Sequence, residues 1–134
     1  MRNYQNLDQV ITEDDTGIIY LSKADEAGGM HPRISLRREG GYVAISASYG
    51  PLEVAMRLRY EDLIRLLSRL RPVEGLQTTR QIGTGQAYIS LGLQQNGDLV
   101  MRPTIVGDAT GHMCLNLILT DGTRDALYNW LNVK

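Results

Sequence analysis

The chain has 134 residues, of which 43% are hydrophobic and 22% are charged, as in an ordinary globular domain. No apolar run approaches the ~20 residues of a membrane-spanning helix, and a single cysteine, Cys114, excludes an internal disulfide. The formal net charge of −1 argues against a surface that is basic throughout. Because the first residues are polar and then acidic, we expect no signal peptide and a cytoplasmic protein with one domain over residues 1–134.

The first half of the chain predicts strands. Residues 1–16 show little periodicity and indicate an arm or an edge segment, whereas residues 17–22 are β-branched and aromatic, as in a short strand. Apolar and polar side chains then alternate over 33–38, 42–48 and 52–58, which are separated by short glycine-containing turns. This alternation indicates antiparallel strands with one face exposed to water.

A helix is predicted to follow these strands. From Tyr60 the apolar spacing changes from two to about 3.6, so that residues 60–70 place their leucines on one stripe. Glu61 and Asp62 suit the first turn of a helix, and Pro72 ends it. The polar segment 73–85 is predicted to connect this half to the next.

The second half repeats the plan. Residues 87–93 alternate, and Asn96-Gly97 is a strong hairpin signal. Residues 99–105 follow as a strand, whose end should lie at a sheet edge or in a bulge because it contains Pro103. Residues 113–119 alternate again, and a helix over 123–131 closes the chain after a cap at Thr120 or Asp121.

The predicted fold class is therefore α+β, with a unit of four antiparallel strands and one helix used twice. The internal repeats span approximately residues 17–72 and 82–132. The segment ISLRREGGYVAI lies in the first repeat, and the similar segment ISLGLQQNGDLVM lies in the second. We expect two sheets of about four strands, with the helices packed against them.

No catalytic or metal-binding pattern stands out. His31 and His112 have no cysteine or carboxylate at ligand spacing and are predicted surface residues. Gly83-Thr84-Gly85 lacks the Lys-Ser/Thr of a phosphate-binding loop, and the acids at 13–15 are predicted to form a solvated loop. Cys114 is predicted to be a buried structural thiol. We therefore expect a non-enzymatic protein without metal or cofactor.

The outward face of the first predicted sheet carries arginines, a tyrosine and small side chains. All but two of the 14 basic residues of the chain are arginines, whose planar guanidinium can stack on bases or grip phosphate. An open sheet face with cations and aromatic rings is typical of single-strand binders. The candidate residues on the first sheet are Arg33, Arg37, Tyr42, Arg57 and Arg59. Tyr88 and Arg102 are candidates on the second sheet. A polar face that merely meets water, or that packs on a neighbouring subunit, explains the same pattern.

Two strand-rich units, each closed by a helix, resemble the superfamily of single-stranded nucleic-acid binders that includes Whirly, kinetoplastid guide-RNA-binding and Pur-alpha proteins. The resemblance covers roughly residues 33–134. The superfamily also includes small bacterial proteins without an assigned role. The resemblance rests on ISLRREGGYVAI … LRYEDLIRLLSRL and on YISLGLQQNGDLV … LNLILTDGTRDALYNWL. The chain lacks the Lys-Gly-Lys type of segment found in Whirly proteins, so no site residue is transferred. The resemblance implies the fold, oligomerisation and single-stranded DNA or RNA as a partner.

Two functions follow from the sequence. The first is non-catalytic binding of single-stranded nucleic acid on the arginine- and tyrosine-bearing sheet face. The alternative is a protein-interaction or scaffold module that does not bind nucleic acid. We also expect a homo-oligomer, most simply a dimer. The closing helix carries Leu127, Trp130 and Leu131 on one stripe, whereas Tyr128 points away from that stripe and should be free to meet a second subunit. Helices or edge strands of two chains would meet there.

Overall fold

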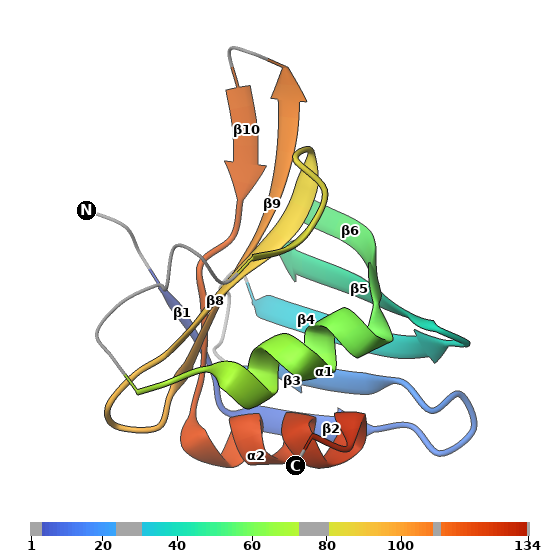
Figure 1. Cartoon of the computed structure of the whole chain (residues 1–134), viewed down its shortest axis with the longest axis vertical. Coiled ribbons are helices and arrows are strands. Elements are labelled where there is room, and N and C mark those ends of the chain that lie inside the picture. The colour runs from blue at the N-terminus through green and yellow to red at the C-terminus, as the bar shows by residue number, and fades with distance from the viewer. Residues whose placement is uncertain (1–3, 24–30, 73–80, 109–110, 134) are drawn as a thin grey trace.

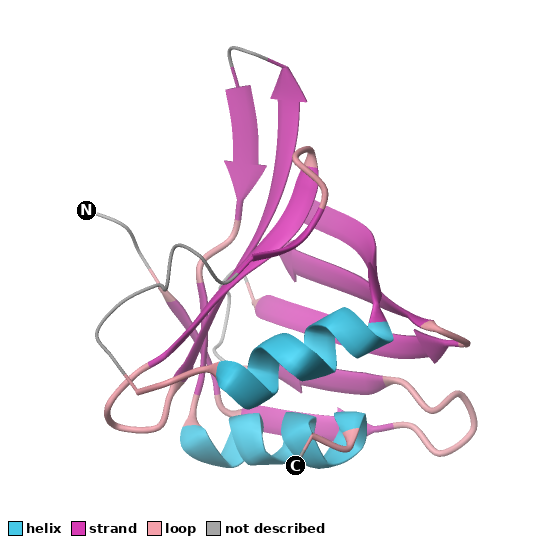
Figure 2. Cartoon of the chain, viewed as in Figure 1, coloured by secondary structure: helices cyan, strands magenta, loops and turns pink. Residues whose placement is uncertain are grey.

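The fold comes from a computed structural model, which describes residues 4–23, 31–72, 81–108 and 111–133. Within these residues the protein is α+β, and it has two β-sheets and two helices, as the sequence predicts (Figures 1 and 2). Neither helix within the described ranges is long and apolar enough to cross a membrane.

The first sheet has five strands, all antiparallel, in the order β2-β3-β4-β5-β6. Side chains alternate along it: Ile34 and Leu36 are fully buried, whereas Arg33 and Arg37 are exposed. The inner face therefore belongs to the core and the outer face meets water. The strands are β2 (Gln9–Thr12), β3 (Ile19–Ser22), β4 (Pro32–Glu39), β5 (Tyr42–Tyr49) and β6 (Leu52–Arg59).

The second sheet has six strands and runs along the long axis of the molecule, across the direction of the first (Figure 1). Its order is β1-β11-β9-β8-β7, and β10 also pairs with β9. The β9–β10 hairpin projects beyond the rest of the fold (Figure 2). The strands are β1 (Gln5–Leu7), β7 (Gln81–Gly83), β8 (Ala87–Leu93), β9 (Leu99–Asp108), β10 (Gly111–Cys114) and β11 (Leu117–Leu119).

Each helix follows a sheet strand and closes the core. Helix α1 (Tyr60–Arg69) follows β6 and contacts β6 and β7, and α2 (Asp121–Leu131) contacts β11, β2 and β3. Figure 1 shows α1 lying between the two sheets and α2 crossing below them. Leu63 and Leu67 of α1 are buried, and so are Leu127 and Leu131 of α2. Both sheets and both helices thus share one hydrophobic core.

The N-terminal segment connects the two sheets. Strand β1 pairs in parallel with β11 of the second sheet, and β2 forms the edge of the first sheet beside β3. Between them, the amide of Asp8 donates to the carbonyl of Ser22, and the carbonyl of Leu7 accepts from the amide of Thr120. The predicted edge segment is present as β2, but β1 was not predicted, since three residues are too few to show a period.

The predicted unit of four strands and a helix, used twice, is not confirmed, because the described residues contain eleven strands. The N-terminal β1 and β2 lie before the first predicted repeat, and β7 lies in the predicted connector. The predicted strand over residues 113–119 is two strands, β10 and β11, with a break at Leu115 and Asn116. The rest of the connector, residues 73–80, lies outside the described residues.

Pro103 lies inside strand β9 and not at a sheet edge, contrary to the sequence prediction. The strand continues to Asp108 and is central, with β8 on one side and both β10 and β11 on the other. Pro103 lies where the neighbouring strand changes: β10 ends at Cys114, opposite Thr104, and β11 begins at Leu117, opposite Met101. Its carbonyl accepts from Leu115 on that side. A missing amide hydrogen is therefore tolerated, since it falls at the gap between two partner strands.

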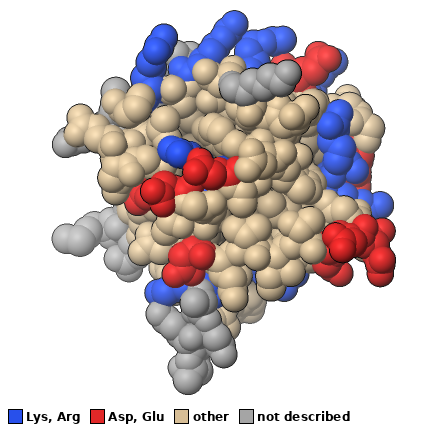
Figure 3. All heavy atoms as spheres, turned by 90° about the horizontal axis from the view of Figure 1, so that it is seen from below, with Lys and Arg blue, Asp and Glu red and all other residues tan. Residues whose placement is uncertain are grey.

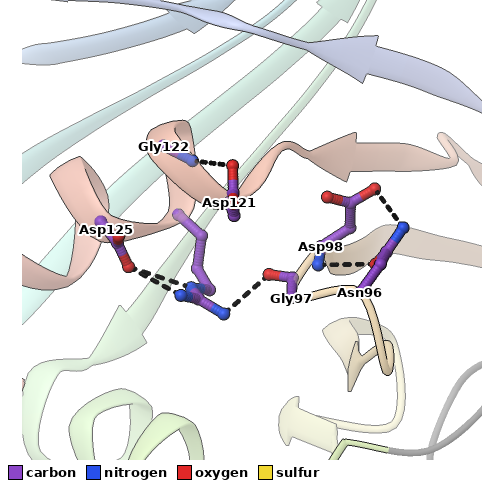
Figure 4. Close-up of polar contacts among 7 residues, drawn as sticks. Asn96, Gly97, Asp98, Asp121, Gly122 and Asp125 are labelled. Atoms are coloured by element: carbon purple, nitrogen blue, oxygen red, sulfur yellow. Dashed lines mark hydrogen bonds and ion pairs between the residues drawn. The ribbon is translucent and has the colours of Figure 1, made fainter.

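The predicted Asn96-Gly97 hairpin is present between β8 and β9 and is fastened to α2. The side-chain oxygen of Asn96 accepts from the amide of Asp98 at 3.0 Å, and Gly97 has a φ of +94° (Figure 4). Arg124 donates to the carbonyl of Gly97 at 2.7 Å and to the carboxylate of Asp125 at 2.8 Å. These bonds hold the turn of the second sheet against the first turns of α2.

The aromatic residues of α2 pack on the chain's own core. Trp130 donates from its indole nitrogen to the carbonyl of Gly17 at 3.0 Å. Tyr128 is half-buried against the core, and burial raises the pKa of its hydroxyl. The prediction that Tyr128 remains free for a second subunit is therefore wrong. Near the end of α2, the hydroxyl of Tyr60 donates to the carbonyl of Leu131, which joins the two helices.

Candidate nucleic-acid interface

The pairing register arranges the outer face of the first sheet in rows that cross the strands. One row contains Ser35 of β4, Ser46 of β5 and Ala55 of β6. The next row contains Arg37, Ala44 and Arg57 on the same three strands. The last row contains Glu39, Tyr42 and Arg59. The face therefore has a centre of small side chains with arginines and a tyrosine at one end.

A shallow depression of about 410 Å³ lies at this centre. The small side chains of Ser35, Ala44, Ser46 and Ala55 leave it open, and Arg37 and Arg57 stand at its border. This volume lies within the range of small-ligand sites, about 300–1,000 Å³. The remaining lining residues are Ile18, Glu39, Ile45 and Met56.

Two arginine–tyrosine pairs lie on this face. The guanidinium of Arg33 lies 4.3 Å from the ring centre of Tyr20, and that of Arg57 lies 4.8 Å from the ring centre of Tyr42. Each pair joins diagonal neighbours on adjacent strands. A stacked guanidinium keeps a planar orientation and leaves its other side open to a base or a phosphate. Tyr42 is 42% exposed, so its ring is also accessible.

Glutamates balance part of the positive charge. Glu39 pairs with Arg57 at 3.3 Å and with Arg37 at 3.9 Å. Glu53 accepts a hydrogen bond from Ser46 at 2.9 Å. Glu13 accepts a hydrogen bond from Tyr20, and this bond is the main reason that the pKa of the Tyr20 phenol is raised, an effect that Arg33 opposes.

Charges of both signs lie on the end of the molecule that α2 occupies. Seen from this end, basic side chains gather along the upper rim, and acidic side chains lie near the middle and, beside further basic ones, at the right-hand rim (Figure 3). Helix α2 contributes the exposed Asp121 and Asp125. The formal net charge of −1 thus averages over regions of opposite sign.

The structure groups five of the seven predicted site residues on one surface. They lie on the outer face of strands β4, β5 and β6, and all are exposed: Arg33, Arg37, Tyr42, Arg57 and Arg59. The outward parity that the sequence predicts for them is therefore present in the sheet.

Tyr88 and Arg102 do not join this group. Both lie on the second sheet, next in sequence to the core residues Ile89 and Met101. Their side chains therefore lie on the face of that sheet that is turned away from the shared core. Arg102 is half-buried and donates to Asn116 at 2.8 Å and to Tyr4 at 3.4 Å. Around them the sheet face is closed, since Ser90 and Thr104 are only 5% and 3% exposed. Tyr88 and Arg102 therefore belong to a separate surface and do not extend the platform of the first sheet.

Three further residues on the outer face of the first sheet were not predicted as site residues. Glu39 continues the outward parity of Arg37 on β4, and Glu53 precedes Ala55 on β6 with the same parity. Tyr20 alternates with the buried Ile19 and Leu21 on β3, so its outward position was also readable from the pattern. The pairing of Tyr20 with Arg33 was not readable, since it depends on the register between β3 and β4.

The other groups considered in the sequence lie apart from this face. His31 and His112 are exposed, as predicted, and Cys114 is half-buried in β10 rather than fully buried. Gly83-Thr84-Gly85 belongs to the β7–β8 turn, where the Thr84 hydroxyl accepts from the amides of Gln86 and Ala87, both at 3.1 Å. Among the described residues, no group of three or more His, Cys, Asp or Glu is suited to a metal ion.

Comparisons with known proteins leave this assignment to the geometry alone. No protein-family model matches the chain, and neither a curated protein nor a solved structure shows significant similarity to it.

Proposed function

We propose that this protein binds single-stranded nucleic acid, without catalysis, on the outer face of strands β3 to β6. The observation that supports the proposal is the pair of Arg–Tyr stacks, Arg33 on Tyr20 and Arg57 on Tyr42, on either side of a depression with a small-residue floor. Single-strand binders combine cations that follow the backbone with planar groups on which bases stack. The open sheet face can receive a single strand lying flat.

The proposal includes the family resemblance. We infer that β4-β5-β6-α1 and β8-β9-β11-α2 are diverged copies of one unit, as in the Whirly, guide-RNA-binding and Pur-alpha superfamily. Both segments run through three antiparallel strands into a helix that packs on the common core. Their outer faces differ: that of the first sheet is open and rich in arginine, and that of the second is largely buried. Binding is therefore assigned to the first copy.

The test is a double substitution, Arg33→Ala with Arg57→Ala, which removes the guanidinium from both stacks. We expect the affinity for a mixed-sequence oligonucleotide to fall about tenfold or more, since a hydrogen bond to a charged group is worth about 1.5–3 kcal/mol. The plot of log affinity against log salt should become shallower by about 0.7 for each lost phosphate contact. Fluorescence anisotropy over a salt series measures both quantities.

The matched control is Arg65→Ala with Arg69→Ala, which removes the same charge from exposed positions on helix α1. Its affinity should stay close to that of the wild type. Equal losses for the two double variants would show a non-specific effect of charge and would refute the assignment to this face.

One observation favours a second candidate function, a protein-interaction module. Strand β6 pairs only with β5, and β10 pairs only with β9, among the described strands. Between these two edges lies an apolar groove of about 520 Å³, where Met113 is 42% exposed. Exposed strand edges beside apolar side chains promote pairing with another chain. We propose that a second copy of this chain occupies the groove with its own edge strand β10, which gives a homodimer.

Light scattering tests this second candidate. The wild type should show a mass of twice 15.0 kDa at micromolar concentration, and Met113→Asp should show 15.0 kDa. Ile11→Asp is the control, since Ile11 is similarly exposed, at 53%, but lies on strand β2 outside the groove. A wild type that stays at 15.0 kDa on concentration would contradict the dimer.

A further inference from the structure

Arg37 and Arg57 flank Ala44 on the outer face of the first sheet. The register places Ala44 between them, with Arg37 on β4 and Arg57 on β6. Two strand spacings separate their backbones by about 10 Å. Both side chains nevertheless approach one group, the carboxylate of Glu39, at 3.9 and 3.3 Å. The two guanidinium groups therefore converge on a single anion.

This convergence has the chemistry of a phosphate site. Carboxylate and phosphate oxygens accept from guanidinium groups in similar geometry, so Glu39 occupies the position that a phosphate would take. The side chains of Arg37 and Arg57 are each 61% exposed, and that of Glu39 is 34% exposed. Exposed ion pairs of this kind are weak, so a backbone phosphate, which also carries one negative charge, can replace the carboxylate.

The adjoining depression can hold the rest of a nucleotide. Its volume of about 410 Å³ borders the two arginines, and its floor combines the apolar Ala44 and Ala55 with the hydroxyl of Ser35. Apolar surface with a few polar groups is typical of sites for small planar ligands. Tyr42 lies beside Ala44 in the direction of Glu39, with Arg57 over its ring.

We infer that Arg37 and Arg57 bind one phosphate of the nucleic-acid backbone, that the depression receives the adjacent nucleoside, and that Glu39 is the internal anion which this phosphate displaces. The inference rests on the proposed function and adds a defined phosphate position to it. Glu39 thus competes with the ligand and lowers the affinity of the free protein.

The test compares Glu39→Gln with Glu53→Gln. Both variants remove one negative charge from the same sheet face, but Glu53 is bonded to Ser46 and lies opposite Ser48, toward the other end of strands β5 and β6. Glu39→Gln should raise the affinity for a mixed-sequence single-stranded oligonucleotide about three- to fivefold, because the competing carboxylate is gone. Glu53→Gln should change it less than about twofold, in keeping with long-range charge alone.

A second substitution shows that the gain passes through the two arginines. Arg37→Ala placed in the Glu39→Gln protein should abolish the gain. Arg33→Ala should lower the affinity of both the wild type and the Glu39→Gln protein, but it should preserve the ratio between them. Thermal unfolding of each variant confirms that the fold is intact. A mononucleotide should shift the amide NMR signals of Ala44 and Arg57 more strongly than the corresponding nucleoside.

The outcomes separate the two proposals. If the wild type binds the oligonucleotide but the two glutamine variants behave alike, the phosphate site is refuted and the binding function stands. If neither the wild type nor the Glu39→Gln protein binds, both proposals are refuted. A gain confined to Glu39→Gln and lost with Arg37→Ala supports the phosphate site.

Discussion

Replacing Leu7 by alanine should lower the free energy of unfolding by about 2–5 kcal/mol, although Leu7 belongs to a strand of three residues. Its side chain is 0% exposed and lies in the core shared by both sheets. Strand β1 pairs with β11 in the second sheet and also contacts β3 and β4 of the first. Removing the isobutyl group would leave a cavity where the two sheets meet, which neither sheet alone can fill.

The matched control for this prediction is Asn6→Ala on the same strand. Asn6 is exposed and pairs opposite Ile118, so its replacement should change stability by less than about 0.5 kcal/mol. Urea unfolding followed by circular dichroism gives both values. A loss below about 1 kcal/mol for Leu7→Ala would show that β1 is not part of the core.

Gly83→Ala should destabilise the protein by more than about 2 kcal/mol, because this position requires glycine. Its φ of +128° lies in a region that side-chain-bearing residues avoid. A Cβ atom added there would lie 2.3 Å from the carbonyl oxygen of Ala87 and 2.8 Å from the Cα of Tyr88. Both are backbone atoms of the β7–β8 hairpin, so the pairing itself would have to shift.

Gly85 provides the control in the same turn. A Cβ atom at Gly85 would meet nothing within 4 Å, so Gly85→Ala should leave the midpoint of thermal unfolding almost unchanged. Differential scanning calorimetry of the two variants measures the contrast. Similar midpoints for both would mean that the β7–β8 turn does not have the backbone conformation described above.

The long elements of the fold were predictable because each carries its own period. Strands β4, β5 and β6 alternate over eight residues each, and the change of period at Tyr60 marks the start of α1. Short strands such as β1 and β7 could not be predicted, since their three residues hold no period and their pairing partners are set by the tertiary fold. The course of β9 through Pro103 depends on the gap between β10 and β11, which is a tertiary feature.

The candidate site was predictable to the same degree. Parity alone placed Arg33, Arg37 and Arg57 on the outer face of one sheet. It could not indicate which arginine meets which acid, because the convergence on Glu39 depends on side-chain reach across two strands. Nor could parity show that the outer face of the second sheet forms a separate surface, which is closed around Arg102.

Titration of the wild-type protein with a mixed-sequence single-stranded oligonucleotide of about 30 nucleotides, over a series of salt concentrations, tests the central claim most directly. The predicted result is binding at low salt that weakens as salt is added. A plot of log affinity against log salt concentration should be linear with a slope of about −2 to −3, because three or four arginines contact phosphate and each contributes about 0.7. A duplex of the same sequence should bind more weakly, because its bases cannot stack on the exposed arginine–tyrosine pairs. Absence of binding to the single strand at low salt would contradict the proposed function.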